Sequence, residues 1–256
     1  MEYNKFSQLK QYHFVFKTYP FDNKLVFANW KMHLSQQEAV SFCEKVVQSD
    51  AVKSKLILAA PAIYLSLINY LFPQLSLAAQ DVSCIKDDFG AYTGEISSRM
   101  LQLIKVGYCI VGHYERRRFF GENNEIVVQK VKNCLKNNIT PVVCFGQESV
   151  DDDPTLDLKI LNDNFTDDDK IIYAYEPYWA IGTGDFRFDV ISSNIEKITS
   201  YLSSSNKLSS LSRRVIYGGS VNSKNIGLLR QLNLDGFLVG GASLKTEELF
   251  KIIQNI

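Results

Sequence analysis

The stretch Ala174-Tyr175-Glu176-Pro177-Tyr178-Trp179-Ala180-Ile181-Gly182-Thr183-Gly184 joins a short apolar run to a segment that mixes rigid and flexible residues. The apolar run begins at Ile171 and predicts a β-strand, which ends because Pro177 cannot donate to a sheet ladder. Glu176 is therefore expected at a strand end, with its carboxylate facing a cavity. A proline and a tryptophan stiffen the next residues, and two glycines free those that follow. We interpret residues 177–184 as a lid behind a catalytic base; an ordinary strand-to-helix turn is the alternative.

Similar apolar runs recur along the chain, and each predicts a strand. They are continuous and do not alternate with polar residues, which is typical of parallel strands covered on both faces. The eight predicted strands are residues 25–28, 56–60, 75–79, 108–111, 141–145, 171–175, 215–217 and 237–239.

Helical patterns separate the predicted strands. Ser35 and Glu38 form a capping box that predicts a helix through Val46, and residues 124–135 carry apolar side chains at helical spacing. Eight strand-helix repeats predict an α/β fold, a single (β/α)8 TIM-barrel domain over residues 25–256. A doubly wound open sheet is the competing layout. It would place a glycine-rich dinucleotide fingerprint after the first strand, where Asn29-Trp30-Lys31 stands instead.

Composition argues against several classes of partner. Lysine plus arginine equals aspartate plus glutamate at 28 each, so no net charge attracts nucleic acid or an anionic membrane. The five cysteines are widely spaced and unpaired in sequence, which favours reduced, mostly buried thiols. No apolar run is long enough to span a bilayer. We expect a soluble cytoplasmic protein, with an aromatic N-terminal extension over residues 1–24 whose role is open.

Polar residues follow the predicted strands at their carboxyl ends, where barrel enzymes carry their chemistry. They are Asn29 and Lys31 after the first strand, Gln80 after the third, His113 and Glu115 after the fourth, and Glu176 after the sixth. A carboxylate, a neutral imidazole and an ammonium around one cavity suit proton abstraction next to a carbonyl, with stabilisation of an enediolate. Such chemistry requires no metal and no redox cofactor.

Glycine-rich turns follow the last two predicted strands, as Gly218-Gly219-Ser220 and Gly240-Gly241-Ala242-Ser243. Bare backbone N–H groups near a helix start bind an anion without any net positive charge on the protein. In a barrel, this pair of loops is the usual phosphate position. We therefore expect a phosphate monoester as the ligand.

Jointly these residues resemble those of the triosephosphate isomerases over residues 25 to about 250. The resemblance implies interconversion of dihydroxyacetone phosphate and D-glyceraldehyde 3-phosphate, in glycolysis and gluconeogenesis. This family is itself a standard example of pKa tuning and of lid closure, so those features follow from the resemblance. The matching segments are Asn29-Trp30-Lys31-Met32, Gly90-Ala91-Tyr92-Thr93-Gly94-Glu95, Val111-Gly112-His113-Tyr114-Glu115-Arg116-Arg117, Ala174-Tyr175-Glu176-Pro177, Ala180-Ile181-Gly182-Thr183-Gly184, Tyr217-Gly218-Gly219-Ser220-Val221 and Asp235-Gly236-Phe237-Leu238-Val239-Gly240-Gly241-Ala242-Ser243-Leu244.

The resemblance also implies a role for each matching residue. In it Glu176 is the base, His113 the neutral electrophile and Lys31 the cationic binder. Asn29 is their hydrogen-bonding neighbour, and the phosphate is held by Gly182, Ser220, Gly240 and Gly241.

A homodimer is implied as well. The loop over residues 87–95 is long for a barrel connection and carries two aromatic residues and two glycines, which suits a projecting finger. In the family this loop inserts beside the partner's active site. Thr93 would then reach toward Asn29 and Lys31 of the second subunit.

The sequence departs from the family's pattern at four positions. Tyr114 stands where a small serine usually partners the base, which leaves the resting position of Glu176 open. Gln147 replaces a glutamate, Asp81 an asparagine, and Asp185 the basic residue that ends the lid. None of these changes removes a catalytic group. Two rival interpretations remain: another phosphate-binding barrel enzyme, and a non-catalytic barrel that acts as a binding protein.

Overall fold

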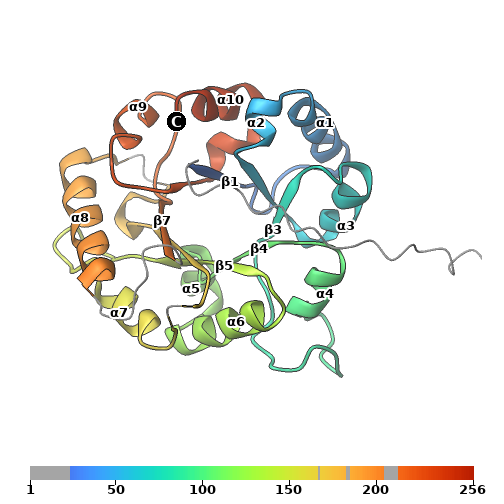
Figure 1. Ribbon diagram of the computed structural model, residues 1–256, viewed down its shortest axis with the longest axis horizontal. Coiled ribbons are helices and arrows are strands. Elements are labelled where there is room, and N and C mark those ends of the chain that lie inside the picture. Colours follow the sequence, from blue (N-terminus) through green and yellow to red (C-terminus); the bar gives the residue numbers. More distant parts are fainter. Residues whose placement is uncertain (1–23, 167, 183–184, 205–212) are drawn as a thin grey trace, which may run out of the picture.

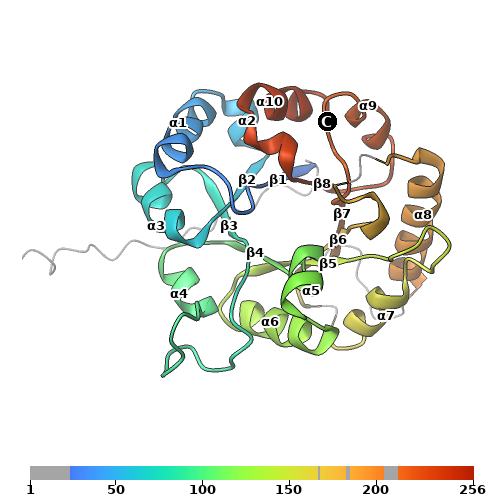
Figure 2. The same ribbon diagram turned by 180° about the vertical axis from the view of Figure 1, so that it is seen from behind.

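Eight parallel strands close into a barrel inside a ring of helices in the computed structural model (Figure 1, Figure 2). The structure describes residues 24–166, 168–182, 185–204 and 213–256. The N-terminal residues 1–23 therefore lie outside the described residues, as do the predicted lid residues Thr183 and Gly184. The predicted (β/α)8 barrel is confirmed.

Each strand pairs with the next along the chain, and β1 pairs with β8 to close the sheet. Val26, for example, is level with Leu56 on one side and Phe237 on the other. The strands are β1 (Leu25–Asn29), β2 (Leu56–Ala60), β3 (Ser76–Ala79), β4 (Tyr108–Val111), β5 (Thr140–Phe145), β6 (Ile171–Tyr175), β7 (Arg213–Tyr217) and β8 (Gly236–Val239).

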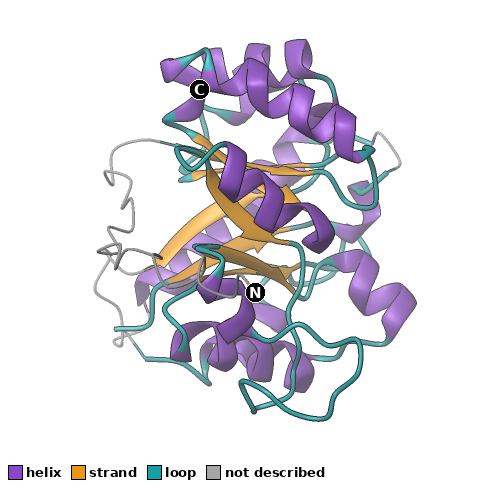
Figure 3. Ribbon diagram, turned by 90° about the vertical axis from the view of Figure 1, so that its right-hand side faces the viewer, coloured by secondary structure: helices purple, strands orange, loops and turns teal. Residues whose placement is uncertain are grey.

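The helices lie outside the barrel wall (Figure 3). The predicted capping box is present at the start of the first helix, since the Glu38 N–H donates to Ser35 Oγ at 3.3 Å and the Ser35 N–H donates to Glu38 Oε2 at 2.7 Å. The α-helices are α1 (Gln36–Val47), α2 (Asp50–Lys53), α3 (Ala62–Leu71), α4 (Ser98–Leu103), α5 (Tyr114–Phe120), α6 (Asn124–Lys136), α7 (Leu156–Asn162), α8 (Phe188–Ser204), α9 (Ile226–Leu229) and α10 (Thr246–Gln254), and the two 3-10 helices are η1 (Tyr178–Ala180) and η2 (Gly241–Leu244).

The core has two parts, which explains the continuous apolar runs. Alternate strand residues such as Phe27, Ile172 and Ala174 form one buried cluster, and their chain neighbours form a second cluster together with the helices. Because side chains alternate between the faces of a strand, the first cluster fills the barrel interior. Glu176 continues the row of Ile172 and Ala174 and so reaches the barrel mouth.

The five cysteines are free thiols within the described part of the chain. Four are buried and Cys84 is half-buried, as predicted. Among the described residues, no helix has both the length and the apolar character needed to cross a membrane.

Candidate active site

One cavity of about 310 Å³ lies at the carboxyl ends of the strands. It brings together predicted residues that are far apart in the sequence. Those that line it are Asn29, Lys31, His113, Glu176, Gly182, Ser220, Gly240 and Gly241. Ile181 of the predicted lid also lines the cavity, whereas Thr93 lies on the exposed loop before α4.

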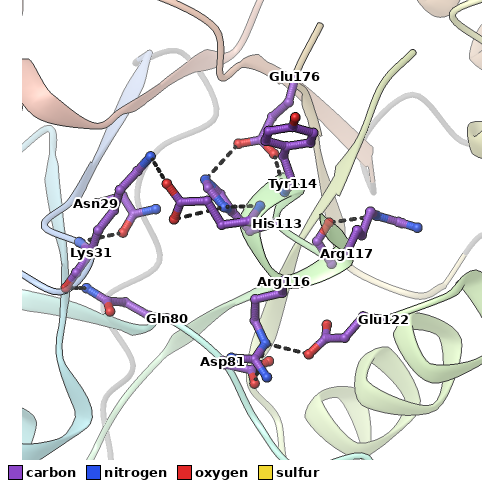
Figure 4. A network of polar contacts seen from close by, with 12 residues as sticks. Asn29, Lys31, Gln80, Asp81, His113, Tyr114, Arg116, Arg117, Glu122 and Glu176 are labelled. Carbon is purple, nitrogen blue, oxygen red and sulfur yellow. Dashed lines mark hydrogen bonds and ion pairs between the residues drawn. The ribbon is translucent and has the colours of Figure 1, made fainter. Parts of the chain in front are cut away.

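Glu176 is almost fully buried, with 1% of its surface exposed. Its N–H donates to the Phe145 carbonyl at 2.8 Å, which extends the β5–β6 pairing by one residue before Pro177 ends it. The carboxylate accepts a hydrogen bond from the Tyr114 N–H at 3.2 Å, and its other oxygen lies 3.3 Å from His113 Nε2 (Figure 4). One backbone donor therefore holds the carboxylate at the cavity wall, with the imidazole beside its other oxygen.

His113 caps the N-terminus of α5, and this position fixes which ring nitrogen faces the cavity. Its Nδ1 accepts a hydrogen bond from the Glu115 N–H at 3.2 Å, so Nδ1 carries a lone pair. In the neutral ring the proton then resides on Nε2, which is directed toward Glu176. The imidazole can thus donate a hydrogen bond into the cavity without being charged.

Lys31 has a left-handed backbone with φ of 52°, which is uncommon for a residue with a side chain. Hydrogen bonds hold this conformation on both sides: the Lys31 N–H donates to Asn29 Oδ1 at 3.0 Å, and Gln80 Nε2 donates to the Lys31 carbonyl at 2.9 Å. The ammonium lies 2.6 Å from Glu115 Oε1. The last residue of β1 and residues that follow β3 and β4 therefore place this cation at the mouth of the barrel.

The charges at the site balance only in part. Lys31 and Glu115 neutralise each other, so Glu176 carries the remaining negative charge. Burial raises the pKa of the Cys144 thiol, and the nearby Glu176 carboxylate raises it further, so this thiol stays protonated beside the base. In the part of the chain that the structure describes, no group of three or more His, Cys, Asp or Glu side chains could hold a metal ion.

Comparison with known proteins identifies the family. The model of the triosephosphate isomerase family matches residues 24–256. The chain is 37% identical over 245 residues to the triosephosphate isomerase of Orientia tsutsugamushi (strain Boryong), which covers 91% of this chain and 97% of that protein. It is 38% identical over 247 residues to that of Mesomycoplasma hyopneumoniae (strain 232), which covers 91% and 99%. For Thermoanaerobacter pseudethanolicus the identity is 36% over 248 residues, with 90% and 98% covered.

The chain belongs to the triosephosphate isomerase family. It is therefore an isomerase that interconverts triose phosphates. This membership favours the isomerase over both rival interpretations of the sequence.

The departures from the usual triosephosphate isomerase pattern now have a structural setting. Tyr114 contacts Glu176 through its backbone N–H, so the bulk of the phenol does not displace the base. Gln147 is buried, and its backbone carbonyl accepts a hydrogen bond from the Tyr178 N–H at 3.0 Å. Asp185 is ion-paired with Arg187 Nη2 at 2.9 Å.

Two contacts of this triosephosphate isomerase site were not predicted from the sequence. Glu115 was noted at a strand end, but its pairing with Lys31 was not. The stacking of Tyr114 on Tyr178, with ring centroids 4.8 Å apart, joins two segments 64 positions apart along the chain. The only available signal was that both aromatic residues lie within two positions of a proposed catalytic residue.

Proposed function

We propose that Glu176, His113 and Lys31 interconvert dihydroxyacetone phosphate and D-glyceraldehyde 3-phosphate through an enediolate, as a step of glycolysis and gluconeogenesis. The observation that carries this proposal is the approach of Glu176 Oε1 to His113 Nε2, at 3.3 Å, in a cavity that Lys31 also lines. A base and a neutral donor at this separation can act on adjacent atoms of one small substrate.

The proton transfers are as follows. Glu176 takes a proton from the substrate carbon next to the carbonyl, while the His113 Nε2–H donates a hydrogen bond to the carbonyl oxygen. The electron pair of the broken C–H bond forms the enediolate, whose negative charge the Lys31 ammonium stabilises. His113 then gives its Nε2 proton to the former carbonyl oxygen and takes up the hydroxyl proton of the neighbouring oxygen, while Glu176 returns its proton to the carbon that bore the carbonyl. The carbonyl has moved by one carbon, and no atom is gained or lost.

The phosphate of the substrate needs its own donors, because Glu115 already neutralises Lys31. We assign this task to backbone N–H groups of Gly182, Gly240 and Gly241 and to Ser220, all of which line the cavity. The turn that carries Ser220 is fixed, since Asn225 Nδ2 donates to the Ser220 carbonyl at 2.8 Å. In this proposal residues 177–184 close over the bound phosphate as a lid.

A homodimer and a cytoplasmic location complete the proposal. The exposed loop with Thr93 supports the dimer, because it projects beyond the ring of helices and presents the apolar side chains of Phe89 and Tyr92. Five free cysteines and a glycolytic role support the cytoplasm.

Replacement of Glu176 by glutamine tests the mechanism. We expect turnover to fall roughly a hundredfold to ten-thousandfold, because a positioned base contributes about that much. Binding of 2-phosphoglycolate should be largely retained, since separate loops grip the phosphate. Steady-state isomerisation in both directions and loss of solvent proton exchange are the measurements. Glu196→Gln on the exposed face of α8 is the control, and near-normal turnover of Glu176→Gln would contradict the assignment.

A further inference from the structure

Two aromatic rings beside the base have no role in the proposed proton transfer. Tyr114 is the first residue of α5 and follows His113, and Tyr178 is the first residue of η1, two positions after Glu176. Their rings stack with centroids 4.8 Å apart and an interplanar angle of 29°. The stack therefore connects the segment of the electrophile to the segment of the base.

The Tyr114 ring is fixed from the side of α5. Arg118 lies one helical turn further on, and its Nη1 donates to the Tyr114 hydroxyl at 2.8 Å. The guanidinium carbon is 5.8 Å from the centre of the same ring. Meanwhile the Tyr114 N–H donates to the Glu176 carboxylate at 3.2 Å (Figure 4). One residue thus holds the base with its backbone and contacts the residues after the base with its ring.

The Tyr178 ring is fixed from the side of the barrel. It is buried, and its N–H donates to the Gln147 carbonyl at 3.0 Å. The ring also packs on Gly146, where an added Cβ atom would lie 3.2 Å from Tyr178 Cε1. Tyr178 then starts the single turn of η1, which leads directly to Ile181 and Gly182 in the cavity wall. The position of this ring consequently sets where the segment 177–182 begins.

We propose that Tyr114 is a positioning residue of the isomerase: its ring, stacked on Tyr178, holds the start of segment 177–182 against α5 and keeps the Glu176 carboxylate beside the Tyr114 N–H and His113 Nε2. This inference rests on the proposed roles of Glu176 and His113. Because aromatic pairs contribute beyond their buried area, loss of the stack should change the population of the positioned base about two- to tenfold.

A double-mutant cycle on turnover tests the coupling. We expect Tyr114→Ala and Tyr178→Ala each to lower kcat about two- to tenfold, with a smaller change in KM, because the positioning of the base is weakened and the phosphate loops are intact. The kcat of the double variant should be no lower than that of the single variant with the lower kcat, since each substitution alone already removes the same stack. Tyr114→Phe keeps the ring and should restore kcat to within about twofold of the wild-type value. Tyr70→Ala, at an 82% exposed position of α3, is the control.

Hydrogen exchange of the amides in segment 177–182, without substrate, gives a readout that does not depend on turnover. Exchange should be faster in Tyr114→Ala than in the wild-type protein, and unchanged in Tyr114→Phe and Tyr70→Ala. If Tyr114→Ala does not fold, Tyr114→Leu, which keeps apolar volume without an aromatic face, is measured in its place with the same expected results.

Unchanged exchange together with unchanged kcat in the variant without the ring would overturn the proposal. Strictly additive effects of the two alanine substitutions on kcat would also overturn it. A wild-type protein without isomerase activity would overturn the proposed function instead. The exchange experiment would still show whether the stack holds the segment.

Discussion

At the scale of single residues, Gly218 determines how much room the base has. It follows β7, and a Cβ atom added to it would lie 2.9 Å from Glu176 Cγ and 3.2 Å from Glu176 Oε1. Real Cβ atoms do not approach carbon atoms so closely, so the Glu176 side chain would have to move. The movement would lengthen its contacts with the Tyr114 N–H and His113 Nε2, at 3.2 and 3.3 Å.

Replacement of Gly218 by alanine should therefore lower kcat by roughly a hundredfold, because a displacement of about 1 Å in a reacting group has that effect. KM for the phosphorylated substrate should change much less. Gly227→Ala is the matched control, since an added Cβ there meets no atom within 4 Å and alanine favours the surrounding helix α9. Steady-state kinetics of the two variants provide the comparison. A kcat of Gly218→Ala within a factor of two of the control would show that Glu176 tolerates the methyl group.

At the scale of elements, four charged side chains connect the residue pair after β3 to α5 and α6, and three of them, Asp81, Arg116 and Glu122, are labelled in Figure 4. Lys130 of α6 is 5% exposed, and its ammonium lies 2.6 Å from Asp81 Oδ1 and 2.5 Å from Glu122 Oε1. Arg116 of α5 pairs with the same two carboxylates. Burial raises the pKa of Asp81, and Lys130 opposes that rise. Lys130 and Arg116 therefore offset part of the cost of burying the Asp81 carboxylate.

We expect Lys130→Met to lower the free energy of unfolding by about 3–5 kcal/mol, because it leaves Asp81 and Glu122 with one cation instead of two. Lys132→Met is the control, since Lys132 lies on the exposed face of the same helix and its loss should matter by less than about 0.5 kcal/mol. Urea unfolding at one fixed protein concentration measures both. Equal midpoints for the two variants would show that Lys130 is dispensable to the network.

A second contact between elements ties the turn after β7 to α10. Glu248 accepts hydrogen bonds from the Ser223 N–H at 2.7 Å and the Ser223 hydroxyl at 3.0 Å. These bonds hold the pKa of Glu248 below its ordinary value of 4.5. A carboxyl whose pKa is lower in the folded state stabilises the fold above the unfolded pKa. This contribution is lost as the pH falls through the folded pKa.

Glu248→Gln should accordingly lower the free energy of unfolding by about 0.5 kcal/mol at pH 7, since solvent screens this contact at the surface. The difference from the wild-type protein should begin to shrink once the pH falls below 4.5, as Glu248 of the wild-type protein takes up its proton. The neighbouring exposed residue supplies the control, Glu247→Gln. Urea unfolding at a series of pH values measures this difference in the free energy of unfolding. A difference that grows as the pH falls would contradict a lowered pKa of Glu248 in the folded state.

At the scale of the whole molecule, the apolar runs predicted all eight strands because each strand is buried on both faces. The bounds were wrong where strand pairing continues past apolar side chains. Pairing of Ile171 with Arg213 begins β7 two residues before the predicted start at Val215, since backbone hydrogen bonds do not require an apolar side chain. Similarly, β5 begins at Thr140, one residue before its predicted start, whereas β3 begins at Ser76, one residue after its predicted start.

Contacts across the barrel mouth could not be predicted in the same way. Lys130 and Asn133 lie on the buried face of α6 because partners satisfy their polar atoms, and apolar periodicity does not report this. The strand ends were enough to identify Glu176, His113 and Lys31 as candidates. The pairing of Lys31 with Glu115 depends on side-chain conformations that only the closed barrel fixes.

The proposed homodimer depends on a loop that leaves the barrel outline. The loop between β3 and α4 extends beyond the ring of helices, below α4 in Figure 1 and again in Figure 2. Two contacts order it: the Tyr92 hydroxyl donates to Asp87 at 2.7 Å, and Asn137, directly after α6, donates to Asp88 at 3.0 Å. A loop that is already ordered loses little conformational entropy when it inserts into a partner.

Two large apolar side chains are exposed, one beside Lys31 and one on the projecting loop. Met32, next to Lys31, is 95% exposed, and Phe89 of the projecting loop is 65% exposed. Contiguous exposed apolar groups mark interaction sites, and the proposed dimer would bring these two groups together. In the proposed dimer the two copies exchange this contact: the loop of each copy covers Met32 of the other. Two-fold symmetry then closes the assembly at two subunits.

Thr93→Arg should separate the subunits, because the exposed threonine at the loop tip would bring a guanidinium toward the ammonium of Lys31 in the partner subunit. We expect sedimentation at micromolar concentration to shift from dimer to monomer, and activity to fall with it, since each active site would lose the partner's loop beside Asn29 and Lys31. Ser193→Arg, at an exposed position of α8 on the opposite side of the barrel, should leave both unchanged. A fully active monomer would refute the dependence of the site on the partner. A Thr93→Arg dimer with unchanged activity would refute the placement of this loop in the interface.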